Sequence, residues 1–392
     1  MVATVIDREL PTAEAADLLE LTRDLAAREL RPEADKAEAT GSFPRALFSQ
    51  LGKLGLLSLP YPEEFGGGGQ PAVVYLQVLE ELARGWATIA LGTSVHVLSC
   101  SAVAEFGTQA QKERFLPDLL GGATLGAYCL SEPHAGSDAG AMRTTAVRQG
   151  TNEDGEYVIT GDKAWITHGS VADFFLVAAR TDDTGSRGIS TFLVPGSATG
   201  LSSGSPEKKM GFRASPTSQL HFDGVRVEAD RRIGAEGQGF RIAMAALDAG
   251  RLGISACAVG LAQAALDVAA EYAGTRSAFG HTIDEFQGVS FLLADAAAGI
   301  AAARQLYLYA ARRKDAGKAF SVEAAMAKLT ATDMAMAVTT DMVQVLGGAG
   351  YVEDHPLERY MREAKVLQIV EGTNQIQRMV IARSLKTRRP GG

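Results

Sequence analysis

The spacing of apolar residues divides the chain into three parts. In the first third, apolar residues recur at helical intervals, which Pro60 to Pro62 and Gly66 to Gly69 interrupt. His96 falls inside one helical stretch, and a lone histidine there is expected to be packed and hydrogen-bonded rather than catalytic. The pattern predicts a helix that begins at Thr12 and further helices over residues 43–54, 73–82 and 88–104.

The middle third changes to short runs with the period of a β-strand. From about Thr124, β-branched and aromatic residues cluster between polar turns, which predicts strands. The connections between them are short, so an antiparallel meander is favoured over strand–helix–strand units. The predicted strands cover residues 157–160, 174–178, 190–194, 219–222 and 225–227.

The last third returns to a helical period. Long Ala- and Leu-rich stretches predict helices over residues 239–273, 286–313, 321–346 and 373–385. Helices of this length with short connections imply an antiparallel four-helix bundle. We therefore expect an α+β protein with an N-terminal all-α domain over residues 1–120, a middle antiparallel β domain over 121–233 and a C-terminal helical bundle over 234–392.

Composition narrows the classes of function. The 392 residues are 46% hydrophobic and 21% charged, as is ordinary for a soluble globular protein. The net charge of −8 offers no electrostatic reason to bind nucleic acid. No apolar run reaches the length of a membrane span, and Met1 to Leu10 lacks the apolar stretch of a secretory signal. Cys100, Cys129 and Cys257 show no metal-ligand spacing and predict buried, reduced thiols in a cytoplasmic protein.

One carboxylate near the C-terminus has the surroundings of a proton acceptor. Glu371 lies between an apolar run that ends at Val370 and Gly372. Apolar neighbours remove hydration, so the carboxylate pKa rises towards neutrality. Thr373 is a suitable N-cap for the helix that follows. A solvent-exposed glutamate in a helix-to-helix turn explains the segment Val370 to Gln377 equally well.

Two motifs of the middle third carry groups suited to a flat polar ring. The segment Tyr128 to Asp138 places small residues and hydroxyls in a loop after a strand, although an ordinary capped turn also explains it. In the segment Lys163 to Gly169, the side chains of Trp165 and Thr167 alternate and should point to one face of a strand. A large aromatic beside a hydroxyl can stack on and hydrogen-bond to such a ring. Taken alone, however, Trp165 is better interpreted as a core residue.

Three segments of the last third carry further candidate groups. Asp248 and Arg251 share a helix face, as a local ion pair would. The segment Arg276 to Gly280, with Phe286 and Gln287, offers an arginine and aromatics at a helix boundary that can hold a pyrophosphate and an adenine. The glycine-rich segment Gln344 to Tyr351 closes a helix, as a C-cap does.

Taken together, these segments resemble the acyl-CoA dehydrogenase family of flavoenzymes. The segment Tyr128 to Asp138 resembles the family's signature, Trp165 to Thr167 its flavin strand, and Val370 to Gln377 its catalytic segment. The resemblance covers essentially the whole chain, with five motifs in the family's order. It implies FAD-dependent α,β-dehydrogenation of an acyl-CoA thioester to the trans-2-enoyl-CoA, with a short or branched acyl chain favoured. The β hydride would pass to flavin N5.

The resemblance also assigns roles to individual residues. Glu371 is the catalytic base that removes the α proton, and no metal is involved. Gly250 stands where some branched-chain and long-chain members carry their glutamate, so Glu371 is the only base. The expected cofactor-binding residues are Tyr128, Leu130, Ser131, Gly136, Ser137, Trp165, Ile166, Thr167, Arg276, Phe279, Phe286, Gln287, Gln344, Gly347, Gly348, Thr373 and Gln375. The expected substrate-side residues are Ser137, Asp248, Arg251, Gly372 and Arg383.

The implied partners are an acyl-CoA substrate, an electron-transferring flavoprotein as acceptor, and further copies of the chain. The family's site binds FAD across a subunit interface, which implies at least a dimer, with a homotetramer built as a dimer of dimers as the usual form. Two departures are Val370, where most relatives have an aromatic residue, and Glu363, where Asp is more usual. The open alternatives are an acyl-carrier-protein dehydrogenase, a flavin oxidase or monooxygenase on the same fold, a non-catalytic FAD-binding protein, and a helical scaffold without cofactor.

Overall fold

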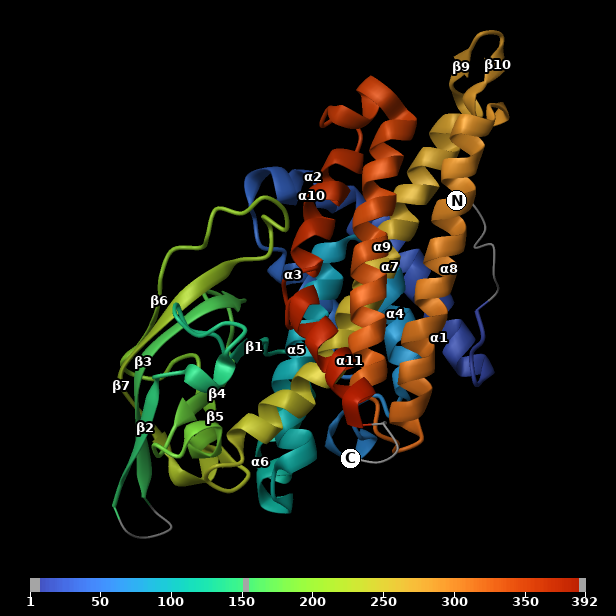
Figure 1. The fold of residues 1–392 in the computed structure, drawn as a ribbon. Coiled ribbons are helices and arrows are strands. Elements are labelled where there is room, and N and C mark those ends of the chain that lie inside the picture. Colours follow the sequence, from blue (N-terminus) through green and yellow to red (C-terminus); the bar gives the residue numbers. More distant parts are fainter. Residues whose placement is uncertain (1–7, 151–154, 388–392) are drawn as a thin grey trace.

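The N-terminal part of the chain is helical (Figure 1). The computed structural model describes residues 8–150 and 155–387, so most of the Met1 to Leu10 segment lies outside the described residues. Thr12 caps the first helix by accepting a hydrogen bond from the Ala15 amide, as predicted. The predicted helices are present, and a short helix before the sheet was not anticipated. Their bounds are α1 Ala13–Leu25, α2 Arg31–Thr40, α3 Arg45–Lys53, α4 Ala72–Gly85, α5 Ala87–Phe106 and α6 Gln109–Leu120.

The middle part is a twisted eight-stranded sheet in the order β6-β7-β3-β2-β4-β5-β8, with β1 paired to β4. The two predicted strands at 219–222 and 225–227 form one long strand, because the chain continues through Asp223 and Gly224 without leaving the sheet. Most neighbouring strands are antiparallel, as predicted. Bounds are β1 Gly126–Cys129, β2 Thr145–Gln149, β3 Glu156–Thr167, β4 Phe174–Arg180, β5 Ile189–Pro195, β6 Leu201–Ser203, β7 Thr217–Glu228 and β8 Arg232–Ile233.

The expectation of an antiparallel meander is wrong for two strand pairs. β2 pairs with β4 in parallel through Thr145 and Arg180. β1 also runs parallel to β4, with Gly126 opposite Phe174. A parallel pair needs a long crossover connection, and the loop after β1, together with β2 and β3, supplies one. As a result, the loop that leaves β1 passes directly beside β3, which carries the tryptophan motif.

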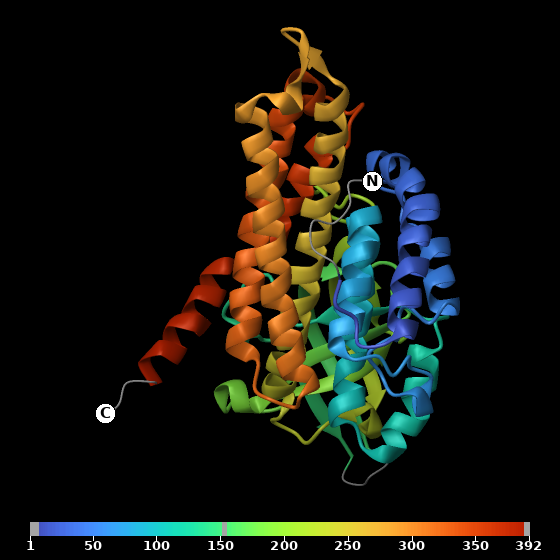
Figure 2. The same cartoon turned by 90° about the vertical axis from the view of Figure 1, so that its right-hand side faces the viewer.

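The C-terminal part is built on three long helices that lie side by side (Figure 1). α10 was not predicted as a helix and packs against α9 and α7. α11 begins on α9 and then extends away from the body of the molecule (Figure 2). The bounds are α7 Gly239–Thr275, α8 Gln287–Asp315, α9 Ser321–Leu346, α10 Leu357–Leu367 and α11 Asn374–Thr387, with a small hairpin of β9 Ser277–Ala278 and β10 His281–Thr282 at the far end of the bundle.

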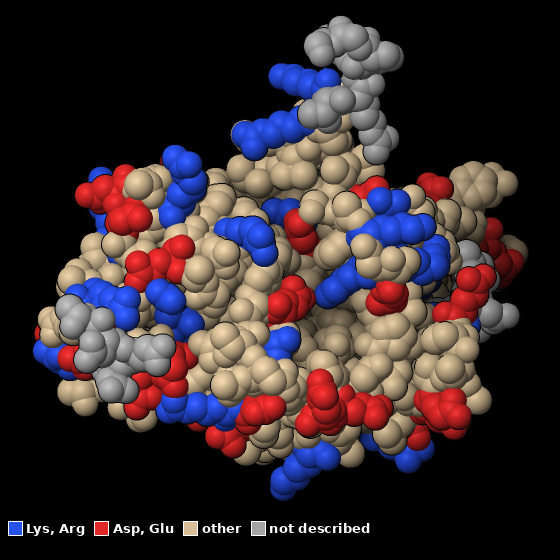
Figure 3. Space-filling model, turned by 90° about the horizontal axis from the view of Figure 1, so that it is seen from below, with Lys and Arg blue, Asp and Glu red and all other residues tan. Residues whose placement is uncertain are grey.

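The structure contains longer apolar helices than the sequence pattern predicted. By length and composition alone, three helices among the described residues (α5, α7 and α8) could cross a membrane. The apolar windows of α5 and α7 are 89% and 94% buried inside the protein, so these two are core helices. The window of α8 is only 22% buried. On the face shown in Figure 3, positive and negative side chains are interspersed.

Candidate active site

Glu371 lies in the turn between α10 and α11, in a left-handed backbone conformation. Its φ is +55°, and the φ of Gly372 is +87°. A non-glycine residue in this region is strained by about 1 kcal/mol or more, and such strain concentrates at functional sites. The Glu371 side chain is largely buried, and its Oε2 has no hydrogen-bond partner among the described residues. The interpretation as a solvent-exposed turn residue is therefore wrong.

Burial raises the pKa of Glu371 to about 7, while Arg251 and Lys328 act to lower it. The desolvation of a carboxylate among apolar groups is the physical cause. Tyr128 of β1 belongs to the same neighbourhood, because burial and then the Glu371 carboxylate both raise the pKa of its phenol. A carboxylate with a pKa near 7 and a free oxygen can act as a general base at neutral pH.

The α7 helix faces this carboxylate with a glycine. A β-carbon at position 250 would lie 2.5 Å from Oε2 of Glu371, so glycine leaves the space that the carboxylate occupies. The next residue, Arg251, is buried and pairs with Asp248 through Nη1 and Oδ1 at 2.5 Å. Asp248 also accepts a hydrogen bond from Ser321. The structure thus brings Arg251 and Gly372 close to the Glu371 carboxylate, with Asp248 paired to Arg251. The resemblance predicted that all three residues lie on the substrate side.

The two motifs of the middle third lie against each other. The Ala164 amide donates to the Ser131 carbonyl at 2.9 Å, and the buried Lys163 ammonium donates to the Leu130 carbonyl at 3.1 Å. Lys163 also pairs with Glu132 at 2.8 Å. The sequence analysis missed both of these buried charges. Because these contacts join the two segments, the hydroxyl loop and the tryptophan strand form one surface.

Trp165 is not a core residue. It is 66% exposed, and its φ is +63° because the pairing of β3 with β7 shifts register between Lys163 and Ile166. Ile166 is buried, whereas Thr167 is only partly buried, so Trp165 and Thr167 share the open face as predicted. The core interpretation failed because a local β-bulge reorients the side chain.

The groups on this surface fit the ring of FAD. Among residues 8–150 and 155–387, the hydroxyls of Ser131 and Thr167 have no hydrogen-bond partner, and the Trp165 ring of the same segment is exposed. At Gly136, nothing lies within 4 Å of the position of a β-carbon. Two free donors and an exposed aromatic face match a flat heteroaromatic ring with polar edges.

The residues predicted to hold the adenosine diphosphate half of FAD lie far from the Trp165 surface within one copy of the chain. Arg276, Phe279 and Phe286 belong to the β9–β10 hairpin and the start of α8, at the far end of the bundle from the sheet (Figure 1). Phe279 is 96% exposed and has a φ of +53°. Gln287 opens α8, Gln344 is exposed near the end of α9, and Gly347 and Gly348 have open space around them. A single copy does not bring these groups to Trp165.

The remaining predicted residues lie at the start of α11 and along it. Thr373 caps the helix by accepting a hydrogen bond from the Ile376 amide at 3.3 Å, as predicted. Gln375 and Arg383 are exposed on the helix that extends outwards. His96 is buried and neutral, because burial lowers its pKa to about 3, and its Nδ1 accepts from the Gly126 amide. The histidine is therefore structural, as predicted, and the three free cysteines are buried.

Lys328 is a further residue that the sequence analysis missed. It lies on α9, is fully buried, and reaches the turn that carries Glu371. The available signal was a lysine on the buried face of a helix among alanines, since Ala324, Ala327 and Ala331 are all buried there. Buried lysines are rare unless they are paired, so such a position predicts a specific partner.

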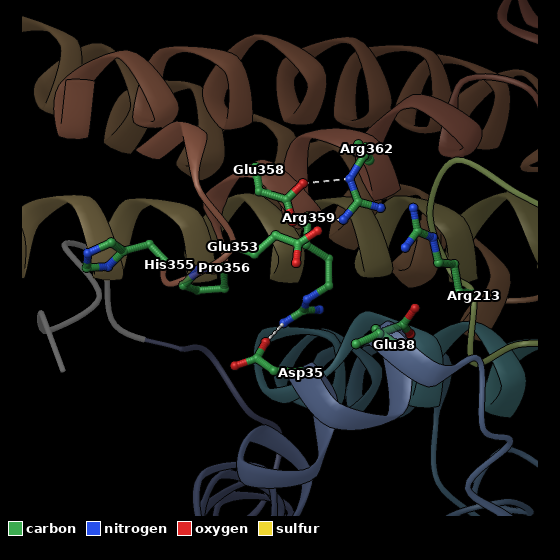
Figure 4. Close-up of a pocket in the computed structure, with 10 residues that line it drawn as sticks. Asp35, Glu38, Arg213, Glu353, His355, Pro356, Glu358, Arg359 and Arg362 are labelled. Carbon is green, nitrogen blue, oxygen red and sulfur yellow. Dashed lines mark hydrogen bonds and ion pairs between the residues drawn. The ribbon is translucent and has the colours of Figure 1, made fainter. Parts of the chain in front are cut away.

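A polar cavity of about 250 Å³ lies between α2, α10 and the loop before β7 (Figure 4). None of the residues predicted for the active site lines it. Two of its three arginines are paired with carboxylates, Arg359 with Asp35 and Arg362 with Glu358, and the lining is almost entirely charged or polar. An apolar acyl chain gains nothing in such surroundings, so this cavity is not the acyl site. It is lined by Asp35, Glu38, Ala39, Arg213, Glu353, His355, Pro356, Glu358, Arg359 and Arg362.

Known proteins share this sequence along nearly its whole length. The family models "Acyl-CoA dehydrogenase, N-terminal domain", "middle domain" and "C-terminal domain" match residues 12–123, 127–225 and 237–386. The "Acyl-CoA dehydrogenase, short-chain specific" of Clostridium acetobutylicum is 42% identical over 373 residues, which cover 95% of this chain and 97% of that protein.

Solved structures have the same fold. The butyryl-CoA dehydrogenase of Megasphaera elsdenii is 42% identical with a TM-score of 0.93, and the match covers 97% of this chain and 100% of that one. A matching chain also occurs in a structure described as the electron transferring flavoprotein of Acidaminococcus fermentans, in the context of flavin-based electron bifurcation. That chain is 40% identical with a TM-score of 0.93, and the match covers 97% of this chain and 99% of that one. The chain therefore belongs to the acyl-CoA dehydrogenase family of FAD-dependent oxidoreductases.

Proposed function

We propose that this protein removes the α proton of a short or branched acyl-CoA through Glu371 while the β carbon loses a hydride. The observation that carries the proposal is the Glu371 carboxylate, which is desolvated, has a pKa near 7 and keeps Oε2 without a partner among the described residues. General-base catalysis of this kind contributes roughly 10²- to 10⁴-fold to a rate. The short acyl chain is favoured because relatives named short-chain specific and butyryl-CoA dehydrogenase are about 42% identical along nearly the whole chain.

The residues around the base have complementary roles. The Glu371 amide donates no hydrogen bond within the described part of the chain and is free to bind the thioester carbonyl, which stabilises enolate charge. Arg251 lies beside the turn and limits how far the pKa of the base rises. Ser131, Thr167 and Trp165 would hold the flavin ring. FAD, when bound, supplies the hydride acceptor.

The exposed apolar surface supports the proposal that the active form is a dimer of dimers. The apolar window of α8 is 22% buried, and Phe291, Met379 and Leu385 stand exposed on α8 and α11. In addition, β3, which carries Trp165, and the β9–β10 hairpin, which directly follows Arg276, lie at different ends of one copy (Figure 1). A second copy would supply the diphosphate-binding groups.

We further propose a cytoplasmic protein with domain boundaries near residues 121 and 234. An electron-transferring flavoprotein is the proposed acceptor, because a structure described as such a flavoprotein contains a similar chain.

An anaerobic titration with acyl-CoAs tests this function. Butyryl-, isobutyryl- and octanoyl-CoA would be added to the purified yellow protein while the flavin band near ~450 nm is followed. We expect butyryl- or isobutyryl-CoA to bleach the band and Glu371→Gln to stay coloured. A yellow protein that no acyl-CoA bleaches would refute the acyl-CoA assignment and point to a carrier-protein thioester or another flavin reaction.

A further inference from the structure

A buried lysine on α9 is bound to the turn that carries the base. Lys328 Nζ donates to the Gly372 carbonyl at 3.0 Å and to Asn374 Oδ1 at 2.9 Å. The side chain is inaccessible to solvent, and burying an ammonium group is costly unless hydrogen bonds compensate it. Both of its hydrogen-bond acceptors belong to the segment directly after Glu371. The lysine therefore serves this turn.

The turn needs external support because two successive residues adopt left-handed conformations. Glu371 has a φ of +55° and Gly372 a φ of +87°. The Gly372 carbonyl accepts a second hydrogen bond from Gln377 Nε2 at 2.8 Å. Asn374, the other acceptor of Lys328, also donates to Asp333 at 2.7 Å on α9. Strained backbone persists only where its surroundings over-determine it, and here those surroundings are α9.

We propose that Lys328 is a positioning residue for the dehydrogenation, whose ammonium fixes the Gly372 carbonyl and thereby holds the Glu371 carboxylate at the α carbon of the acyl group. The proposal rests on the proposed function and adds a residue to it. A displacement of about 1 Å at a reacting group can cost on the order of 100-fold in rate. Lys328 acts through the backbone of the turn and touches no reacting atom.

The same ammonium acts on the charge of the base. The titratable groups that act on Glu371 are Arg251 of α7, Lys328 of α9 and Tyr128 of β1. Asp248 is paired with Arg251. Burial lowers the pKa of Lys328 to about 7, while Glu371 and Asp333 act to raise it, so the ammonium form prevails on the acid side of neutrality. Arg251 and Lys328 both favour the ionised carboxylate, so removing the ammonium raises the pKa of Glu371 above its value of about 7. A tether that only supported the fold would not shift this pKa.

Three variants separate the tether from the charge. Lys328→Met removes both, whereas Lys328→Gln keeps a hydrogen-bond donor without the charge. Lys365→Met is the matched control, because Lys365 is exposed on α10 and its side chain donates to Gln368. Holoenzyme with butyryl-CoA would be assayed for kcat, KM and the pH profile of kcat/KM, and flavin content and melting temperature would be recorded for each variant.

We expect Lys328→Met to lower kcat at least tenfold, with KM within about threefold, and to move the acid limb of kcat/KM to higher pH. Lys328→Gln should recover part of kcat but keep the shifted limb, and Lys365→Met should match the wild type. Wild-type kcat and an unshifted limb in both Lys328 variants would overturn the proposal. The proposal would also be overturned if the Lys328→Gln variant lost kcat only in proportion to its lost flavin and its acid limb of kcat/KM stayed at the wild-type pH. If none of the acyl-CoAs bleaches the flavin of the wild-type protein, the proposed function has failed instead.

Discussion

Replacing Glu371 by glutamine should abolish turnover and, at the same time, stabilise the protein at alkaline pH. Glutamine has nearly the same shape but cannot accept a proton. Burial raises the pKa of Glu371 from 4.5 to about 7. A raised folded-state pKa means that the contribution to stability is fully present below pH 4.5 and is lost as the pH rises through 7. The glutamine side chain has no proton to lose, so the variant avoids this loss.

The magnitude follows from the shift. A gap of about 2.5 pH units at ~1.36 kcal/mol per unit gives an upper bound of about 3 kcal/mol at pH 8. The two proteins should be equally stable near pH 4.5, and the glutamine variant should be the more stable at pH 8. For activity, a pKa near 7 leaves about one tenth of the wild-type base ionised at pH 6 and about nine tenths at pH 8.

The assay combines two measurements on the FAD-loaded protein. Denaturant unfolding at pH 5 and pH 8 reports stability, and anaerobic stopped-flow bleaching with butyryl-CoA reports chemistry. The wild-type rate should rise about tenfold from pH 6 to pH 8, while the Glu371→Gln rate should be lower by roughly 10²- to 10⁴-fold and independent of pH. Wild-type bleaching by the variant would place the base elsewhere. Equal stability of both proteins at pH 8 would show that the carboxylate is not desolvated as described.

Other predictions concern buried charges and the subunit interface. Glu363 is buried, and its pKa is raised to about 7, so its contribution to stability is lost as the pH rises from 4.5 through 7. Glu363→Gln should therefore make the melting temperature less dependent on pH between pH 5 and 8. A wild-type pH profile of the melting temperature in this variant would contradict the prediction. Arg8→Met breaks a buried pair with Glu80 and should cost about 3–5 kcal/mol in denaturant unfolding. The exposed control Arg28→Met should cost below about 1 kcal/mol, and equal losses would refute the distinction. Arg276→Ala should lose flavin when the protein is diluted; unchanged flavin content would exclude a diphosphate role across subunits.

The local pattern of the sequence predicted most of the helices and strands and singled out Glu371 as the candidate base. The helix predicted over residues 321–346 coincides with α9, and the strands predicted over 174–178 and 190–194 lie within β4 and β5. These predictions were correct because the spacing of apolar residues along a helix or strand indicates which of its sides is buried. The raised pKa of Glu371 could be anticipated for the same reason, since its apolar neighbours are adjacent in sequence. The helix α10, Leu357–Leu367, was not predicted.

Only the tertiary structure decided what surrounds the base. Gly250, Tyr128 and Lys328 come from α7, β1 and α9, and nothing in the local pattern of any one of them points to Glu371. The exposure of Trp165 depends on a register shift against β7, a strand about fifty residues away. Periodicity reports burial within one element, whereas these contacts depend on how distant elements pack and on backbone irregularities that their pairing imposes. That difference separates Glu371, the proposed base that the sequence pointed to, from the groups that surround it.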